Sequence, residues 1–181
     1  MAALIQHLEA HLGKMTGGVS LAEGISVAEF LNQPIEGVSV FATIGLSHHV
    51  LLLPSGKTCR MELVFCCSGR FKQAALSALD TVASQILATH DALREGAVVS
   101  RSGSLWPGSS LVALLVYSPV CFPDTFRVDR SSSPPTVIAW LIPITSEELG
   151  IIEKYGWTAL ENMFEDLDPD LFDLERPSIA E

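Results

Sequence analysis

The chain has 181 residues, of which 48% are hydrophobic and 18% are charged, and its net charge is −10. This length fits one domain with a sizeable core, and the composition excludes a disordered protein. The longest apolar stretches reach about ten residues, whereas a helix that crosses a bilayer needs about 20. The N-terminus also lacks the basic start and apolar run of a secretory signal. We therefore expect a protein of the cytoplasm that does not enter a membrane.

The first third of the chain predicts one helix followed by strands. Residues 2–12 place four apolar side chains on one helical stripe, and Gly17-Gly18 ends this helix. A short strand is predicted at 26–31. Residues 38–46 are rich in β-branched and aromatic residues, which favour strands, and further strands are predicted at 48–53 and 58–67. Because short turns separate these three segments, an antiparallel meander is predicted.

The middle third predicts a long helix and further strands. Residues 70–93 repeat apolar side chains at a spacing near 3.6, and Glu95-Gly96 closes this helix. Strands are predicted at 98–99, 111–117, 122–128 and 136–142, with the continuously apolar 111–117 in the centre of the sheet.

Residues 101–110 are predicted to form a loop around Pro107-Gly108 that carries Trp106. Trp106 has two interpretations. It is either a lid packed over the core or an exposed anchor for a partner, since Trp is frequent among binding hot spots.

The C-terminal helices have clear boundary signals. Thr145 fits an N-cap, and Glu148, three residues later, completes a capping box. Gly156 fits the position after the last helical residue, Tyr155. A second helix is predicted at about 158–165, and beyond Leu167 the chain is acidic and is predicted to be extended.

The negative charge is concentrated in this last segment. Residues 1–144 contain ten acidic and nine basic residues, a net of −1, whereas residues 145–181 contain eleven acidic and two basic residues, a net of −9. Such a surface repels nucleic acid, which is bound through Lys and Arg, and attracts a basic protein. Glu161, Glu165, Asp166 and Asp168 are therefore candidate partner contacts. A solvated helix face with a solubilising tail is the alternative.

The cysteines predict neither a metal site nor a disulfide framework. There are four, and none forms a C-x-x-C pair. Cys66 and Cys67 are adjacent in a predicted strand, so their side chains should point to opposite faces as small buried hydrophobes.

Motifs for catalysis and ligand binding are incomplete. The segment Pro54-Ser55-Gly56-Lys57-Thr58 resembles the end of a phosphate-binding loop, but it lacks the earlier Gly and precedes a strand rather than a helix. Segment 45–49 lacks the second Gly of a nucleophile elbow. His7 and His11 lack the Glu of H-E-x-x-H, and the C-terminal acids lack the pattern of a calcium loop. We expect no catalytic residue, cofactor or metal.

These elements predict an α+β fold: a single domain with a central mixed, mainly antiparallel sheet packed by helices. We expect residues 1–34 to form an N-terminal helix and lead-in, and residues 35–178 to form the body of the domain.

Several segments resemble the bacterial branch of the suppressor-of-fused family. They are FATIGLS at 41–47, MELVF at 61–65, PGSSLVALL at 107–115, WLIPITSEEL at 140–149, YGWTALENMF at 155–164 and RPS at 176–178. The resemblance implies a mixed α/β fold and no enzymatic activity. Animal members are larger and bind a transcription-factor peptide in a cleft between two domains, and this chain has room for the first domain only. Some bacterial members resemble immunity proteins that neutralise a toxin of the same genome.

Three functional hypotheses remain open. The first is a protein-binding domain, most specifically an immunity protein against a basic toxin domain. The second is an oligomerising or architectural domain, favoured by a mean hydropathy of +0.36. The third is an enzyme of unrecognised type, which would require a cluster near two strands to converge; that cluster consists of His48, His49, Arg60 and Glu62.

Overall fold

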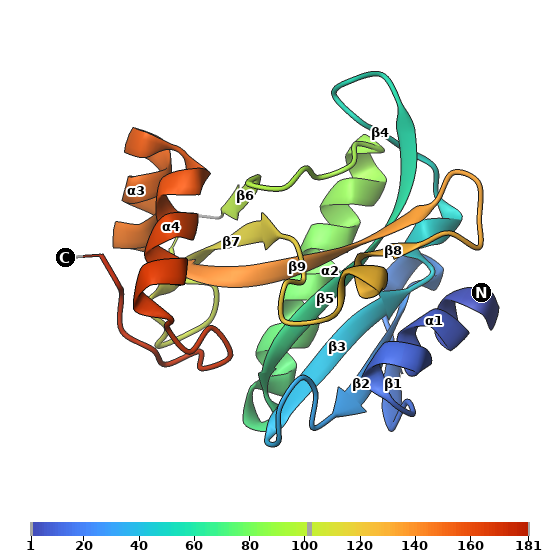
Figure 1. Ribbon diagram of the computed structural model, residues 1–181, viewed down its shortest axis with the longest axis horizontal. Coiled ribbons are helices and arrows are strands. Elements are labelled where there is room, and N and C mark those ends of the chain that lie inside the picture. The colour runs from blue at the N-terminus through green and yellow to red at the C-terminus, as the bar shows by residue number, and fades with distance from the viewer. Residues whose placement is uncertain (1, 101–102, 181) are drawn as a thin grey trace.

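The computed structural model describes residues 2–100 and 103–180, and in this part of the chain nine strands form one sheet (Figure 1). The spatial order is β1-β2-β3-β5-β9-β7-β6, with β4 beside β5 and β8 beside β9. The strands are β1 (Gly17–Ser20), β2 (Ser26–Leu31), β3 (Val38–Ile44), β4 (Leu51–Leu52), β5 (Thr58–Ser68), β6 (Val98–Ser100), β7 (Leu111–Tyr117), β8 (Val128–Asp129) and β9 (Thr136–Thr145).

Strand pairing is antiparallel except between β5 and β9, which run parallel with Arg60 opposite Thr136. These two long strands are at the centre, and both of their faces are buried over most of their length. The continuous apolar runs of their sequences reflect this two-sided burial. The predicted fold class, one α+β domain with a mixed and mainly antiparallel sheet, is confirmed.

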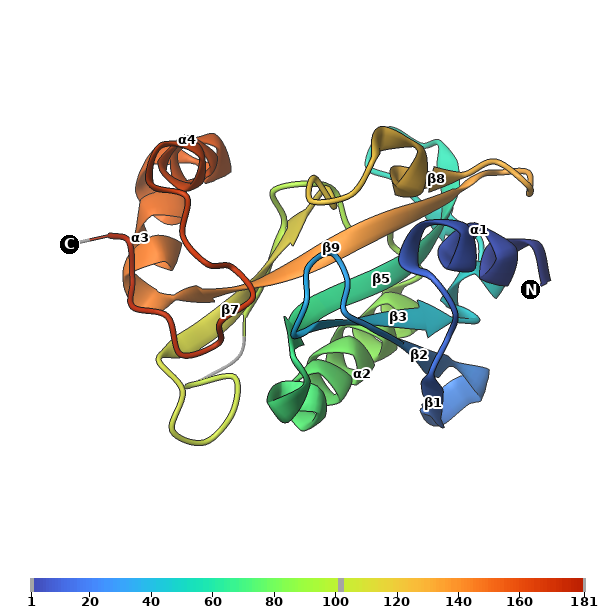
Figure 2. The same cartoon turned by 60° about the horizontal axis from the view of Figure 1, so that its bottom comes forward.

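Four helices cover the sheet on its two faces (Figure 2). They are α1 (Ala2–Leu12), α2 (Lys72–Thr89), α3 (Ser146–Tyr155) and α4 (Trp157–Leu167). The buried stripe of α2 packs on one face, together with Met61, Leu63 and Cys67 of β5. The apolar sides of α1 and α4 pack on the other face, which includes Val64 and Cys66. Cys66 and Cys67 thus face opposite layers, as predicted. No helix of the described chain is long and apolar enough to span a bilayer.

The predicted meander is wrong in its middle strand. Instead of a strand at 48–53, the chain makes a 3₁₀ turn at Leu46–His48 and pairs only through β4. β3 therefore pairs directly with β5, and β4 pairs with the opposite end of β5. Gly45, with φ 112°, makes the reversal possible because a Cβ there would lie 2.9 Å from the carbonyl oxygen of Gly24.

Three other boundaries differ from prediction. Residues 122–128 form a 3₁₀ turn at Asp124–Arg127 rather than a strand, and only β8 pairs. The helix predicted at 70–93 ends at Thr89 because His90 adopts a left-handed conformation. Gly17-Gly18 opens β1 rather than ending α1, which stops at Leu12. The predicted loop 101–110 forms no regular element from 103 onward, and its first two residues lie outside the described chain.

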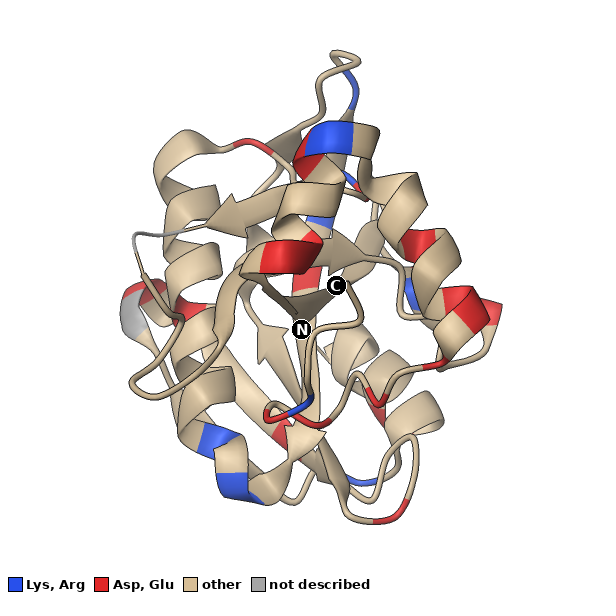
Figure 3. Cartoon of the chain, turned by 90° about the vertical axis from the view of Figure 1, so that its left-hand side faces the viewer, with Lys and Arg blue, Asp and Glu red and all other residues tan. Residues whose placement is uncertain are grey.

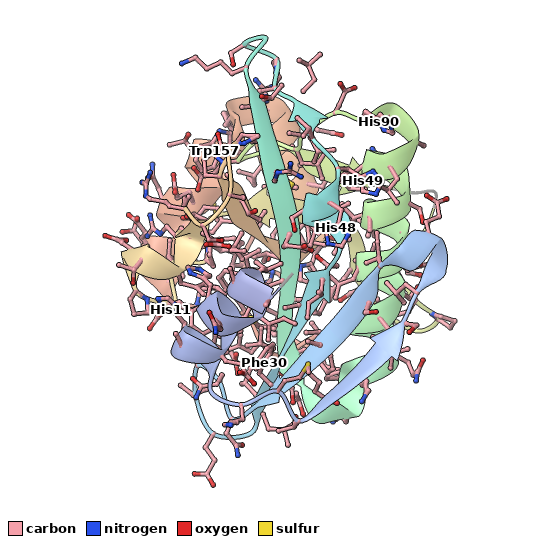
Figure 4. The ribbon with its side chains drawn as sticks, turned by 90° about the vertical axis from the view of Figure 1, so that its right-hand side faces the viewer. His11, Phe30, His48, His49, His90 and Trp157 are labelled. Atoms are coloured by element: carbon pink, nitrogen blue, oxygen red, sulfur yellow. The ribbon has the colours of Figure 1, made fainter. Side chains whose placement is uncertain are left out.

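The two histidines of α1 attach this helix to the 3₁₀ turn at Asp124–Arg127, and Figure 4 labels one of them, His11. His7 Nε2 lies 2.9 Å from the carbonyl oxygen of Phe126, and His11 Nε2 lies 3.0 Å from Thr125 Oγ1. Both side chains are half-buried. Their i, i+4 spacing therefore serves docking of α1. Among the described residues, no group of three or more His, Cys, Asp or Glu side chains is placed to hold a metal ion.

Candidate protein-interaction surface

The C-terminal helices are fixed to the sheet by a buried ion pair. The predicted capping box is present: Thr145 Oγ1 accepts from the N–H of Glu148, whose carboxylate accepts from the N–H of Thr145. That carboxylate is fully buried and also receives two bonds from Arg176, at 2.5 and 2.8 Å. Arg176 is itself 95% buried and donates to the carbonyl oxygens of Pro143 and Pro177. One carboxylate thus starts α3 and anchors the tail.

The tail is consequently packed rather than merely extended. Leu174 and Ala180 are buried, and the N–H of Ile179 donates to Glu148. Thr145 Oγ1 donates to Ser178 Oγ at 3.0 Å. The segments 140–149 and 176–178, which carry much of the family resemblance, therefore meet in space. One buried polar network, formed by Thr145, Glu148, Arg176 and Ser178, joins the two segments.

α4 is held against the end of β7 by aromatic contacts and one hydrogen bond. The Trp157 ring packs edge-on against Tyr117, with 6.2 Å between centroids. Gly96 allows this packing because a Cβ at that residue would lie 2.3 Å from the Trp157 ring. The Tyr117 hydroxyl donates to Glu161 Oε1 at 2.6 Å. Glu161 is therefore half-buried and bonded, unlike a freely solvated acid.

Two carboxylates, those of Glu161 and Glu95, lie beside the Tyr117 side chain. Burial, together with the hydrogen bond to Glu161, raises the pKa of Tyr117 above its ordinary value. Glu95 lines the same pocket as Tyr117, and its negative charge and that of Glu165 raise this pKa further. Glu95 Oε1 also accepts from the N–H of Ser118 at 3.1 Å. The α2–β6 connection and α4 thus bring acids from distant parts of the sequence to one corner.

The remaining predicted acids are exposed on α4 and its C-terminal end, and Figure 3 marks in red the acidic positions along the two last helices and the tail. Glu165, Asp166 and Asp168 are all exposed, and among the described residues none forms an ion pair. The chain from 157 to 175 contains no Lys or Arg. We name Glu95, Glu161, Glu165, Asp166 and Asp168 the acidic surface.

Trp106 borders other elements than the α4 acids do. It is half-buried and packs against the α2 side of the core. Its indole borders a pocket shared with Ala78 and Leu114, and a second one shared with Leu174 and Glu175. The ring thus forms part of the wall between its loop, α2 and the tail, while a fraction of it faces solvent.

In the polar cluster that an enzyme would require, Glu62 and Arg60 form hydrogen bonds with main-chain groups. Glu62 is fully buried and accepts from Thr43 Oγ1 and from the N–H groups of Gly45 and Ser47. Arg60 Nη1 donates to the carbonyl oxygens of Ser47 and His48. Both side chains thus shape the turn after β3, and burial raises the pKa of Glu62 despite these bonds.

Of the two histidines, His48 lies beside Arg60, which bonds its main-chain carbonyl oxygen and lines a pocket with it, whereas His49 lies apart. The His49 ring lies 6.4 Å from His90, between centroids, rather than beside Glu62 (Figure 4). In the described chain no hydrogen bond joins the side chain of His48 or His49 to Glu62 or Arg60.

Sequence reasoning missed three residues of this region. Glu95 was assigned only to the end of a helix, Tyr117 only to a buried strand, and Arg176 only to the tail. Each of them meets its partner across at least 23 residues of chain. The one signal available was chemical: an Arg in an acidic tail needs a carboxylate, and several were candidates.

Comparison with protein families gives a decisive match. The model described as "Suppressor of fused protein (SUFU)" matches residues 22–177, most of the chain. The chain belongs to the suppressor-of-fused family. The match begins after β1 and ends one residue after Arg176, so it includes the sheet from β2 onward, the acidic surface and the arginine that anchors the tail.

Relatives within and beyond bacteria share this suppressor-of-fused architecture. The immunity protein YqcF of Bacillus subtilis (strain 168) is 24% identical over 158 residues, which cover 86% of this chain and 82% of YqcF. A suppressor-of-fused homologue from Neisseria gonorrhoeae superposes with a TM-score of 0.73 at 17% identity, over 99% of this chain and 94% of that one.

Two further structures extend the fold similarity. The chain in the Sufu–Fu complex gives a TM-score of 0.71 at 16% identity, over 98% of this chain and 91% of that one. Drosophila Suppressor of Fused gives 0.69 at 16% identity, over 98% of this chain and 50% of that one. This chain therefore spans half of the Drosophila protein.

Proposed function

We propose that this protein is a non-enzymatic binding domain that contacts a basic protein partner through its acidic surface. The observation that carries the proposal is the exposed, unpaired set of acids on α4. Glu165 and Asp166 lie in the last turn of α4 and Asp168 directly follows it, so a regular helix carries these charges. The family context supports it, because one relative is named an immunity protein and another structure is a complex with a protein partner.

Most specifically, we propose an immunity protein that neutralises a toxin domain in the cytoplasm. Toxins that act on nucleic acid need basic clefts to bind phosphates. An acidic helix face would occlude such a cleft and accelerate association by long-range attraction. Glu165, Asp166 and Asp168 have no intramolecular ion pair to break among the described residues, so a partner's Lys or Arg would find them available.

The partner is proposed to be a protein rather than nucleic acid or a membrane. The same negative charge that attracts a basic protein repels phosphate backbones and anionic lipid headgroups. Trp106, half-exposed at the edge of the tail, is proposed as a second contact, because a packed aromatic side chain adds contact area at little entropic cost.

A second candidate function, self-association, is favoured by a separate patch. Exposed apolar side chains gather around the edge strand β1 and the β2–β3 turn: Met15, Val19, Leu31 and Ile35. An edge strand with apolar neighbours can pair with another copy. Light scattering tests self-association. A dimer mass supports an oligomerising role, and a monomer mass at a protein concentration of about 100 μM excludes a dimer with a dissociation constant well below about 100 μM.

The immunity role predicts that a toxin domain is encoded beside this protein's gene, and the test uses that domain. The two purified proteins are mixed at micromolar concentration in low salt and passed over an affinity column for one of them. Co-elution in a fixed ratio, together with rescue of growth when both are expressed, supports the role. The absence of a complex under these conditions would refute it, and an unrelated acidic protein of similar charge serves as the control.

A further inference from the structure

A groove opens beside the acidic surface where β7 ends. It lies between the end of β7, the first residues of β9, β8 and the α2–β6 connection, and its volume is about 230 Å³. Its apolar walls come from Leu93, Met61, Val116, Val128, Val137, Ile138 and Ala139. Such walls suit aliphatic carbon, because each methylene removed from water contributes favourably.

The rim of this groove is negatively charged. Glu95 and Tyr117 line it directly, and the Tyr117 hydroxyl is bonded to Glu161. Arg127 also lines the groove, but its Nη2 lies 3.0 Å from Asp124 Oδ1, so this positive charge is already paired. The rim therefore presents two carboxylates, Glu95 and Glu161, beside one cation that is paired with Asp124.

An apolar slot with carboxylates at its mouth matches the chemistry of a long basic side chain. Lys and Arg bury their methylene stems against apolar surface and keep the charged end at the edge. A purely apolar side chain would leave the rim carboxylates without a partner. An acidic one would be repelled by them.

We propose that this groove receives a lysine or arginine side chain of the protein partner. This inference rests on the proposed function and deepens it, since it specifies what the partner inserts and where. The stem packs between Leu93, Val137 and Ala139, and the cationic end reaches Glu95 and Glu161. The exposed acids of α4 then guide the encounter, and the groove supplies the specific contact.

Two substitutions remove the rim charge while keeping its shape. Glu95→Gln and Glu161→Gln each retain a carbonyl oxygen that can accept the bonds from Ser118 N–H and the Tyr117 hydroxyl. Glu153→Gln is the matched control, because Glu153 is an exposed acid on α3 that does not line the groove. Thermal melting of all three variants should give melting temperatures close to that of the wild type, which checks that they fold.

A small probe tests the groove without any partner. In an ¹⁵N-resolved NMR titration, N-acetyl-lysine-methylamide should shift the amide resonances of Leu93, Val116 and Ala139, with a dissociation constant on the order of 1 mM. The norleucine analogue, which lacks the ammonium group, should shift them at least fivefold less. Equal shifts from both probes, or shifts spread over the α4 surface instead of the groove, would overturn the proposal.

The toxin complex separates this inference from the proposed function. If the complex forms, the Glu95→Gln/Glu161→Gln double variant should weaken it at least tenfold, while Glu153→Gln changes affinity less than twofold. A complex that forms with unchanged affinity for the double variant overturns the groove assignment but not the proposed function. If no complex forms, the immunity role fails, and the probe titration alone decides whether the groove binds a basic side chain.

Discussion

The Arg176–Glu148 pair should dominate the stability of the C-terminal third. We consider the substitution Arg176→Met, which keeps most of the aliphatic stem and removes the guanidinium. Glu148 would then remain fully buried without its two bonds from Arg176, and the carbonyl oxygen of Pro143 would also lose a donor. Leaving one member of a buried ion pair uncompensated costs about 3–5 kcal/mol.

For a chain of this length, each kcal/mol of destabilisation lowers the melting temperature by about 2–4 °C. Arg176→Met should therefore lower it by roughly 6–20 °C, measured by circular dichroism and checked by urea unfolding. Arg70→Met is the control. Arg70 pairs with Glu175 at 2.7 Å, but the two side chains are 60% and 64% exposed. Its loss should cost no more than about 1 kcal/mol, because water already screens such pairs.

A double variant completes the test. Gln at position 148 can still close the capping box with Thr145 but carries no charge to bury. Glu148→Gln/Arg176→Met should thus be more stable than Arg176→Met alone. If Arg176→Met destabilises the protein no more than Arg70→Met does, the view that this pair anchors the tail is refuted.

Three further predictions concern single sites. Burial raises the pKa of Glu62 above its ordinary value of 4.5. The protonated side chain therefore stabilises the fold fully below pH 4.5, and this stabilisation is lost as the pH rises through the raised pKa. In urea titrations Glu62→Gln should gain stability relative to wild type as the pH rises above 4.5, and a constant difference would contradict this. Cys121 is half-buried and its pKa is lowered by hydrogen bonding to Cys66, whereas burial raises the pKa of Cys67 to about 12. Iodoacetamide should therefore label Cys121 first in mass spectra of the native protein, and equal labelling of Cys67 would refute this order. Charge reversal of Glu165 and Asp166 should change the melting temperature by less than about 3 °C, because exposed charges contribute little to folding, and a larger loss would show that these acids are structural.

Local signals in the sequence predicted local structure well. Thr145, Glu148 and Gly156 define α3 because capping depends on residues within one turn of each other. The apolar residues spaced along one face of α2 and the continuous apolar run of β9 likewise predicted a helix and a strand that the structure contains. The failures occurred where apolar residues alternate by chance: Phe122 and Phe126 suggest a strand, but they pack side by side across a 3₁₀ turn, with 4.7 Å between ring centroids.

Contacts between distant segments could not be derived from pattern alone. The parallel pairing of β5 with β9 brings together strands separated by the whole of α2 and β7. Likewise, the sequence placed Glu161 on an acidic helix but gave no reason to set it against Tyr117. The charge asymmetry pointed to the acids of α4 but not to Glu95, and the groove beside them requires the end of β7, β8 and β9 to be seen together.

The most direct test of the central claim is the association rate with the neighbouring toxin domain, measured by stopped flow as ionic strength rises. Attraction by the acidic surface predicts a rate that falls steeply between about 10 and 150 mM salt, as the screening length shortens from about 30 to 8 Å. Reversing the charge of Glu165 and Asp166 should slow the low-salt rate at least tenfold and flatten this dependence. A rate that is insensitive to salt and unchanged by the reversal would contradict the account.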